Sequence, residues 1–289
     1  MKNRTIKTIV YANEMDMGGF PVRQAFPSRK AEQIDPFLLL HHANLEVDPD
    51  VPVMQAGVGP HPHRGFSPVT FIFKGGVHHR DSRGNNSVIY AGGTQWMNAG
   101  MGVIHSERPP VNIEELGGRQ ELLQLWVNTP AAHKMDAPAY QPLTAEATPV
   151  IVSEDGRTTI RVVSGELNSV KGPIHSYTSV NTFTVDMKKG GRYYFLLPQH
   201  HNAFIYLLDG KLFAAGKEEL DAHFTAVLDT DGEGIELEAL EDTRFFLGSG
   251  EPLNEPVVSH GPFVMNSQTE LMEAFRDYQL GKMGVLIEE

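Results

Sequence analysis

The sequence contains no cysteine, which excludes disulfides, thiolate zinc sites, Cys-ligated iron–sulfur clusters and cysteine nucleophiles. It also lacks an apolar run long enough to span a membrane as a helix, and the N-terminal basic residues are not followed by a signal-peptide core. We therefore expect a cytoplasmic protein that does not bind membranes.

Positive charge is scarce as well. The chain has 24 Lys and Arg against 36 Asp and Glu, which gives a formal net charge of −12. Because nucleic-acid affinity comes mainly from neutralising phosphates, this balance argues against direct binding to nucleic acid. It leaves room for a basic protein partner.

Helical periodicity is also rare, and short apolar clusters bounded by Gly, Pro, Asn or Asp dominate. Such clusters predict strands, among them 69–73, 77–81, 87–90 and 122–128. Closely spaced short strands with turns between them favour an all-β sandwich or barrel. One helix is predicted near the C-terminus, where Ser267 and Glu270 form a capping box and Gly281 suits the position after the last turn. We interpret it as a packing helix.

The 289 residues are sufficient for two domains. Residues 129–149 contain four prolines, and we interpret this segment as the crossing between domains. Strand-like runs resume after it. We therefore predict an N-terminal domain at 1–135 and a C-terminal domain of the same architecture at 136–289.

With thiols absent, the 13 histidines are the natural candidates for chemistry. His61 and His63 form an i, i+2 pair, and so do His105 and Glu107. Residues two apart in a strand point to the same face, so each pair can direct two ligands into one barrel. Three imidazoles and a carboxylate suit Fe(II), Mn, Ni, Cu or Zn with open coordination positions. The alternative is that these pairs are ordinary surface or core residues.

The second half contains no such pattern. Its histidines include the neighbours His200 and His201, and His175, His223 and His260, but no H-x-H is followed by an H-x-E. We predict that the C-terminal domain holds no metal and has a structural role.

A family resemblance adds to these observations. Residues 61–66 (HPHRGF), 79–82 (HRDS) and 95–107 (QWMNAGMGVIHSE) resemble the signature of the pirin family, which belongs to the cupin superfamily. Residues 18–20 (GGF), 35–39 (DPFLL), 251–258 (EPLNEPVV) and 261–266 (GPFVMN) are also similar to pirin sequences. The resemblance runs through nearly the whole chain.

The resemblance implies two stacked cupin barrels, of which the N-terminal one binds a single metal, typically iron. By motif position the ligands would be His61, His63, His105 and Glu107. It further implies a quercetin 2,3-dioxygenase that cleaves flavonols with O2. For such a reaction we expect Glu107 to loosen from the metal and to act as the general base. The alternative within the family is a non-enzymatic, iron-bound redox sensor that regulates a protein partner.

Two further pairs of residues lie two positions apart in predicted strands. His79 and Asp81 are expected on a solvent-facing shoulder of a turn, with a role behind the ligands or at the substrate as the alternative. Gln124 and Trp126 share one face of a predicted strand. The two alternatives for this pair are contact with the pocket and ordinary strand packing.

Overall fold

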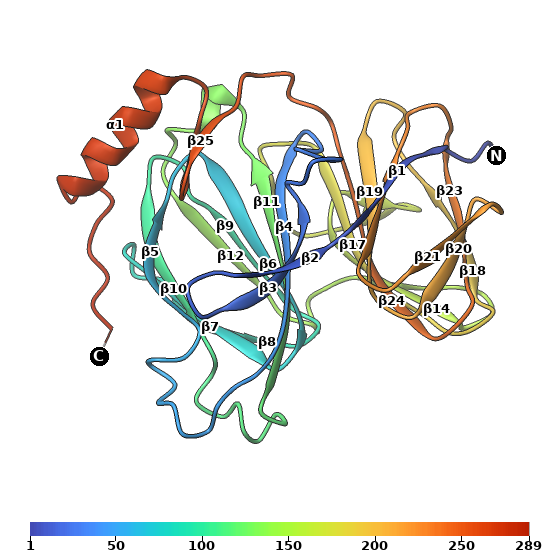
Figure 1. The fold of residues 1–289 in the computed structure, drawn as a ribbon, viewed down its shortest axis with the longest axis horizontal. Helices are drawn as coiled ribbons and strands as arrows, with labels where there is room; N and C mark the ends of the chain where they lie inside the picture. The colour runs from blue at the N-terminus through green and yellow to red at the C-terminus, as the bar shows by residue number, and fades with distance from the viewer. Residues whose placement is uncertain (289) are drawn as a thin grey trace. The chain divides into compact units, whose positions relative to one another are not determined.

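The computed structural model describes residues 1–288, which form two compact units (Figure 1). Unit 1 comprises Met1–Glu14, Arg23–Leu40 and Ala147–Leu253. Unit 2 comprises Met15–Val22, His41–Glu146 and the chain from Asn254 onward. The units therefore differ from the predicted division at residue 135, because segments from both ends of the chain join the unit formed by the other half.

Unit 2 contains the candidate metal ligands and is built on two antiparallel sheets. The larger sheet has the order β12-β9-β6-β11-β4-β3-β2, of which β2, β3 and β4 contain residues of both units. The smaller sheet has the order β5-β10-β7-β8. The strands are β2 (Asn13–Asp16), β3 (Pro21–Phe26), β4 (Phe37–Glu46), β5 (Val58–His63), β6 (Phe66–Lys74), β7 (Gly76–Asp81), β8 (Asn86–Tyr90), β9 (Thr94–Asn98), β10 (Val103–Arg108), β11 (Arg119–Asn128) and β12 (Ala139–Leu143).

Unit 1 repeats this plan of one seven-stranded and one four-stranded antiparallel sheet. The orders are β1-β22-β19-β24-β17-β14-β13 and β18-β23-β20-β21, and β15 with β16 forms a short hairpin. The strands are β1 (Ile6–Tyr11), β13 (Val150–Val152), β14 (Thr158–Ser164), β15 (Glu166–Leu167), β16 (Val170–Lys171), β17 (Val180–Met187), β18 (Arg192–Leu196), β19 (Asn202–Asp209), β20 (Lys211–Ala214), β21 (Glu218–Asp221), β22 (Phe224–Leu228), β23 (Gly234–Ala239) and β24 (Thr243–Gly250). The N-terminal strand β1 belongs here because it pairs with β22 along the sheet edge.

The predicted strands are confirmed, and the structure extends most of them by a few residues. The segment 129–149, interpreted as the interdomain crossing, includes the change from unit 2 to unit 1 after Glu146, and it also contains regular structure that the sequence did not predict. A single 3-10 turn, Ala131–His133, is followed by β12, which pairs with β9 from Ala139 opposite Asn98 to Leu143 opposite Thr94. Proline is compatible with this position because β12 is an edge strand.

The C-terminal segment of unit 2 carries the hairpin β25 (Val258–His260) and β26 (Phe263–Met265), and then the predicted helix α1 (Gln268–Gln279). The Ser267 hydroxyl accepts from the backbone N–H of Glu270 at 3.3 Å, as the capping box predicts. Leu271 and Ala274 are buried against Phe263 of β26. The helix thus packs as expected, and it holds the hairpin in place. Among residues 1–288, no helix is long and apolar enough to cross a membrane.

Candidate metal centre

Adjacent strands of the smaller sheet of unit 2 carry the four predicted ligands. His61 and His63 lie at the end of β5, and His105 and Glu107 lie on β10. The strands pair antiparallel with His105 opposite His61, and the register shifts between His105 and Glu107. Gly65 turns the chain after β5 with a φ of +88°, and a Cβ there would lie 2.0 Å from the carbonyl oxygen of Val264.

The three imidazoles converge on one point. Each offers a nitrogen, and these nitrogens lie within 4.8 Å of one another. The ring centroids of His61 and His105 are 4.3 Å apart, and those of His63 and His105 are 5.0 Å apart. His61 Nδ1 donates to the carbonyl of Gly59 at 2.8 Å, and His63 Nδ1 donates to the carbonyl of Pro262 at 3.3 Å. These bonds fix the proton on Nδ1 and leave the Nε2 lone pair for a metal.

The buried nitrogens of this group fit a metal ion. His63 and His105 are 3% and 2% exposed, and the Nε2 atom of each has no hydrogen-bond partner. Burying a polar atom without a partner costs free energy, and a bound cation would remove that cost. Burial lowers the pKa of His63 and of His105 well below the usual value, and the neighbouring histidines lower both further. Both rings are therefore neutral near pH 7, as metal ligation requires.

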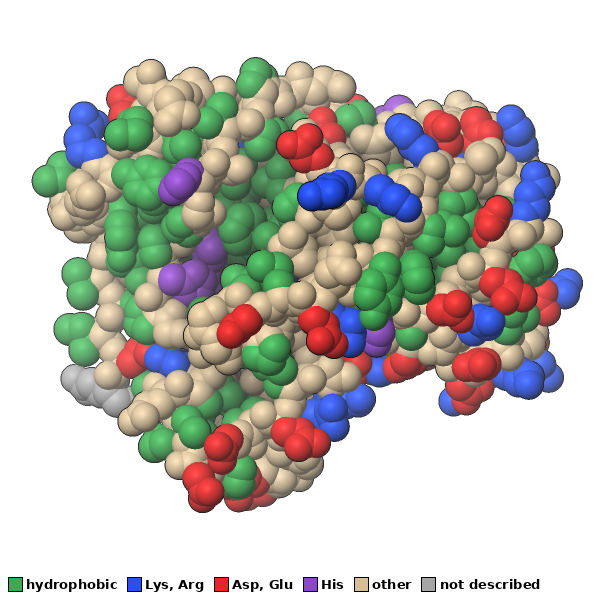
Figure 2. Space-filling model, viewed as in Figure 1, with side chains coloured by type: hydrophobic (Ala, Val, Ile, Leu, Met, Phe, Trp, Pro, Cys, Tyr) green, Lys and Arg blue, Asp and Glu red, His purple; other side chains and the backbone are tan. Residues whose placement is uncertain are grey.

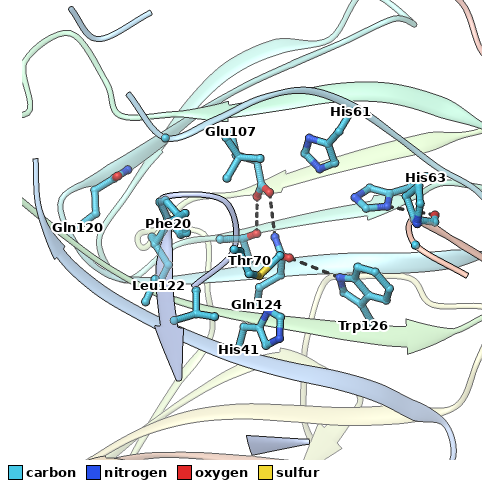
Figure 3. Close-up of a pocket in the computed structure, with 17 residues that line it drawn as sticks. Phe20, His41, His61, His63, Thr70, Glu107, Gln120, Leu122, Gln124 and Trp126 are labelled. Atoms are coloured by element: carbon cyan, nitrogen blue, oxygen red, sulfur yellow. Dashed lines mark hydrogen bonds between the residues drawn. The ribbon is translucent and has the colours of Figure 1, made fainter. Parts of the chain in front are cut away.

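Glu107 stands beside this group, not within it. Its carboxylate accepts from the Thr70 hydroxyl at 2.6 Å and from the Gln124 amide at 2.8 Å (Figure 3). Trp126 Nε1 donates to Gln124 Oε1 at 3.4 Å and so orients that amide. The structure therefore brings three of the four predicted ligands together and holds the carboxylate at the adjoining wall.

A cavity of about 400 Å³ opens over His61, His63 and Glu107. Figure 2 shows histidine side chains at the bottom of a hollow whose walls are mainly hydrophobic. This size lies within the range of small-molecule sites, about 300–1,000 Å³. The lining residues are Met17, Phe20, Val22, His41, Ala43, Gly57, Val58, His61, His63, Thr70, Glu107, Gln120, Leu122, Gln124, Trp126, Gly261 and Pro262. Gln124 and Trp126 thus face the cavity.

Several site residues were missed by sequence reasoning. His41 from β4 and Thr70 from β6 line the cavity, and Pro262 supplies the carbonyl that orients His63. The strand alternation around Thr70 was the available signal for that residue, whereas nothing local marks Pro262 as a neighbour of His63.

The expectation that His79 and Asp81 face solvent is wrong. They are 2% and 5% exposed, because β7 pairs with β10 on the side opposite to β5. Burial of the Asp81 carboxyl opposes its ionisation, but hydrogen bonds from His79, Asn85 and Arg83 lower its pKa below the usual value. A buried, ionised carboxylate therefore lies behind the histidine cluster.

Unit 1 contains one further group of potential ligands, at His200, His201 and Glu251. His200 and Glu251 are exposed, and the ring nitrogens of His201 lie 3.3 Å from Ser249 Oγ and 3.5 Å from Ser179 Oγ. Both nitrogens of the buried member thus have hydroxyl partners. The absence of a metal from the C-terminal domain stays a prediction.

Buried neutral histidines predict acid sensitivity of the metal-free protein. Burial lowers the pKa of His41 and of His201 to about 4. Between pH 6.5 and 4 these rings take up protons only in the unfolded chain, so stability falls as the pH drops through that window. Each pKa unit corresponds to about 1.4 kcal/mol. We expect the urea midpoint of chelator-treated protein to decrease from pH 7 to pH 5, and His41→Gln with His201→Gln to reduce that slope. An unchanged midpoint would contradict the claim that burial keeps these two histidines neutral in the folded protein.

Two family models and several known proteins are similar to this chain. The family model described as Pirin matches residues 19–127, and the one described as the Pirin C-terminal cupin domain matches residues 182–284. A Pseudomonas aeruginosa protein, provisionally named a quercetin 2,3-dioxygenase, is 38% identical over 266 residues, which cover 91% of this chain and 92% of that protein. Pirin-like protein 2 of Arabidopsis thaliana is 33% identical over 96% of this chain and 85% of its own length.

A solved structure agrees with the fold. The crystal structure of a quercetin 2,3-dioxygenase from Acinetobacter baumannii matches with a TM-score of 0.92 and 36% identity. The match covers 99% of this chain and 100% of that one. The prediction of an all-β protein with two cupin barrels and a short C-terminal helix is confirmed.

Proposed function

Because this chain belongs to the pirin family, we propose that it is a metal-dependent dioxygenase that cleaves a flavonol-like substrate with O2. The observation that carries the proposal is the pair of buried Nε2 atoms of His63 and His105, which have no hydrogen-bond partner, together with the mainly apolar cavity that His63 lines. The names of two relatives, from Pseudomonas aeruginosa and Acinetobacter baumannii, support the same substrate class.

His61, His63 and His105 would hold one divalent transition metal, for which we propose Fe(II); Mn, Ni, Cu and Zn also suit the ligands. We propose Glu107 as the fourth ligand, although in the structure its carboxylate faces Thr70 and Gln124. A bound metal would supply Lewis-acid chemistry that lowers the pKa of a substrate hydroxyl.

Glu107 is the proposed general base. Its carboxylate lines the cavity, half-buried, so it can reach a substrate hydroxyl. Thr70 and Gln124 hold its two oxygens in place by donating hydrogen bonds.

The cavity walls suit a flat aromatic substrate. Apolar surface in the cavity comes from Leu122 and Trp126, both on β11, and from Phe20 in the turn between β2 and β3. Such walls exclude water from the reacting groups and strengthen the electrostatic interactions among them. His41 and Gln120 are the polar groups on the wall away from the histidine cluster, and they could bind substrate hydroxyls.

The alternative function is a redox sensor that uses a bound iron to regulate a protein partner and catalyses nothing. We favour the enzyme because the histidines open onto a cavity of ligand size with a carboxylate on its wall. A sensor needs no such space beside its metal. The cytoplasmic location stays a prediction from the sequence.

The direct test is aerobic incubation of Fe(II)-loaded protein with quercetin. We expect the flavonol absorption to disappear with matching O2 uptake, and both to stop after treatment with a chelator. Protein that binds the metal but consumes neither quercetin nor O2 would exclude this substrate and favour the sensor.

A further inference from the structure

A buried carboxylate and a second imidazole lie in series behind His105. His79 Nδ1 is 3.5 Å from His105 Nδ1, and His79 Nε2 is 3.1 Å from Asp81 Oδ2. The strand register produces this series, because β7 pairs with β10 so that Asp81 lies opposite His105 and His79 opposite Glu107. All of these contacts lie within unit 2.

The carboxylate fixes the direction of every hydrogen bond in the series. An ionised carboxylate only accepts, so His79 carries its proton on Nε2 and presents a lone pair at Nδ1. That lone pair accepts the Nδ1 proton of His105. His105 is then left with a lone pair on Nε2, the buried atom that has no other partner. One tautomer of each ring satisfies all the contacts.

His105 differs in this from the other two histidines. The Nδ1 atoms of His61 and His63 donate to the neutral backbone carbonyls of Gly59 and Pro262. His105 donates to an imidazole that is itself bonded to a negative charge. An acceptor of this kind increases the electron density on the ligating nitrogen more than a carbonyl does.

The neighbours hold both members of the series in place. Asp81 Oδ1 accepts from the backbone N–H groups of Arg83 at 2.9 Å and Asn85 at 3.0 Å, and the Asn85 side chain donates to Oδ2 at 2.7 Å. The ring of His79 stacks on Tyr140, with centroids 4.0 Å apart and planes inclined by 4°. These contacts fix the orientation of both side chains, which is the condition for a strong outer-shell effect.

We propose that Asp81 and His79 are positioning residues that fix the Nδ1–H tautomer of His105 and strengthen it as a metal ligand. The inference rests on the proposed metal site, but it adds residues and a role that the proposed activity does not require. Neither residue touches the cavity, so both act only through His105.

Asp81→Asn tests the series most directly, because it replaces the hydrogen-bond acceptor of His79 with a donor. The amide oxygen can keep the two backbone hydrogen bonds, while the amide nitrogen turns toward His79 Nε2 and donates to it. Asn85 is half-buried, so its displaced amide can turn to water. His79 must then carry its proton on Nδ1, where it faces the Nδ1 proton of His105. His105 avoids this clash only by moving its own proton to Nε2, which blocks ligation.

We expect Asp81→Asn to bind Ni(II) about 10- to 100-fold more weakly than the unaltered protein in competition with a chelator of known affinity. Asn85→Ala is the matched control, because it removes a hydrogen bond to the same carboxylate and leaves the series intact. It should bind Ni(II) within about twofold of the unaltered protein. A folded Asp81→Asn protein with unchanged affinity would overturn the inference.

A second measurement needs neither the metal nor a variant. In metal-free protein with 15N-labelled histidine, long-range 1H–15N correlation spectra should show His79 protonated on Nε2 and His105 on Nδ1. The opposite tautomer of either ring refutes the proposed series, even if Asp81→Asn fails to fold. Failure of the proposed function looks different, since quercetin would persist while the tautomers and the affinity change remain as expected.

Discussion

Replacing His63 by alanine is expected to abolish metal binding together with quercetin cleavage. His63 is one of three imidazoles that share a site. The two remaining imidazoles would hold a divalent ion poorly, because the Glu107 carboxylate is bonded to Thr70 and Gln124. Loss of an outer-shell partner alone typically costs 10- to 100-fold in affinity, so loss of a ligand should cost more than about 100-fold. The metal content measured by elemental analysis after anaerobic loading should fall from one equivalent per chain to near zero.

The matched control is His201→Ala in unit 1. It removes, from the other candidate group, a buried histidine whose pKa burial also lowers, and we expect the variant to retain one equivalent of metal and full activity. Two equivalents in the unaltered protein, with one lost in His201→Ala, would show that the C-terminal domain also holds a metal. Full metal content in His63→Ala would mean that the histidine cluster is not the site.

Replacing Glu107 by glutamine is expected to lower the rate of quercetin cleavage per bound metal by about 10²- to 10⁴-fold, the usual contribution of a general base. The substitution keeps the shape of the side chain. Its amide can still accept from Gln124 through oxygen and donate to the Thr70 hydroxyl, which also has lone pairs. The pocket should therefore stay intact while the proton acceptor is lost.

Dividing the rate by the metal content separates the two roles proposed for Glu107. A fall in metal content reports its role as a ligand, and a fall in the rate per bound metal reports its role as a base. Glu114→Gln removes an exposed carboxylate from the same unit and should change neither quantity. An unchanged rate per bound metal in Glu107→Gln would show that Glu107 is not the general base.

Local patterns in the sequence identified much of the architecture. Short apolar clusters and turn residues located the strands on both sides of the predicted crossing, and Ser267 with Glu270 located the start of helix α1. These features depend on hydrogen bonds and side-chain directions within a few residues, so they can be read without knowing the fold. The proline-rich segment misled because β12 is an edge strand, where proline is tolerated.

The candidate ligands were identified in the same way. The spacing of His61 with His63 put both on one face of a strand, and the structure agrees because both residues lie on β5 with converging rings. The same parity applied to His79 and Asp81, but it could not tell a buried face from an exposed one. Which face is buried depends on the neighbouring strand, and β10 is that neighbour.

The histidine pairs are thus what the sequence by itself determined about this protein, together with its all-β character and its family. The tertiary structure alone decided how they are used. It placed β5 and β7 on either side of β10, turned Glu107 toward Thr70 and Gln124, and returned Pro262 from the far end of the chain to His63. Strand pairing and burial arise from contacts between distant segments, and no pattern of nearby residues encodes which segments will meet.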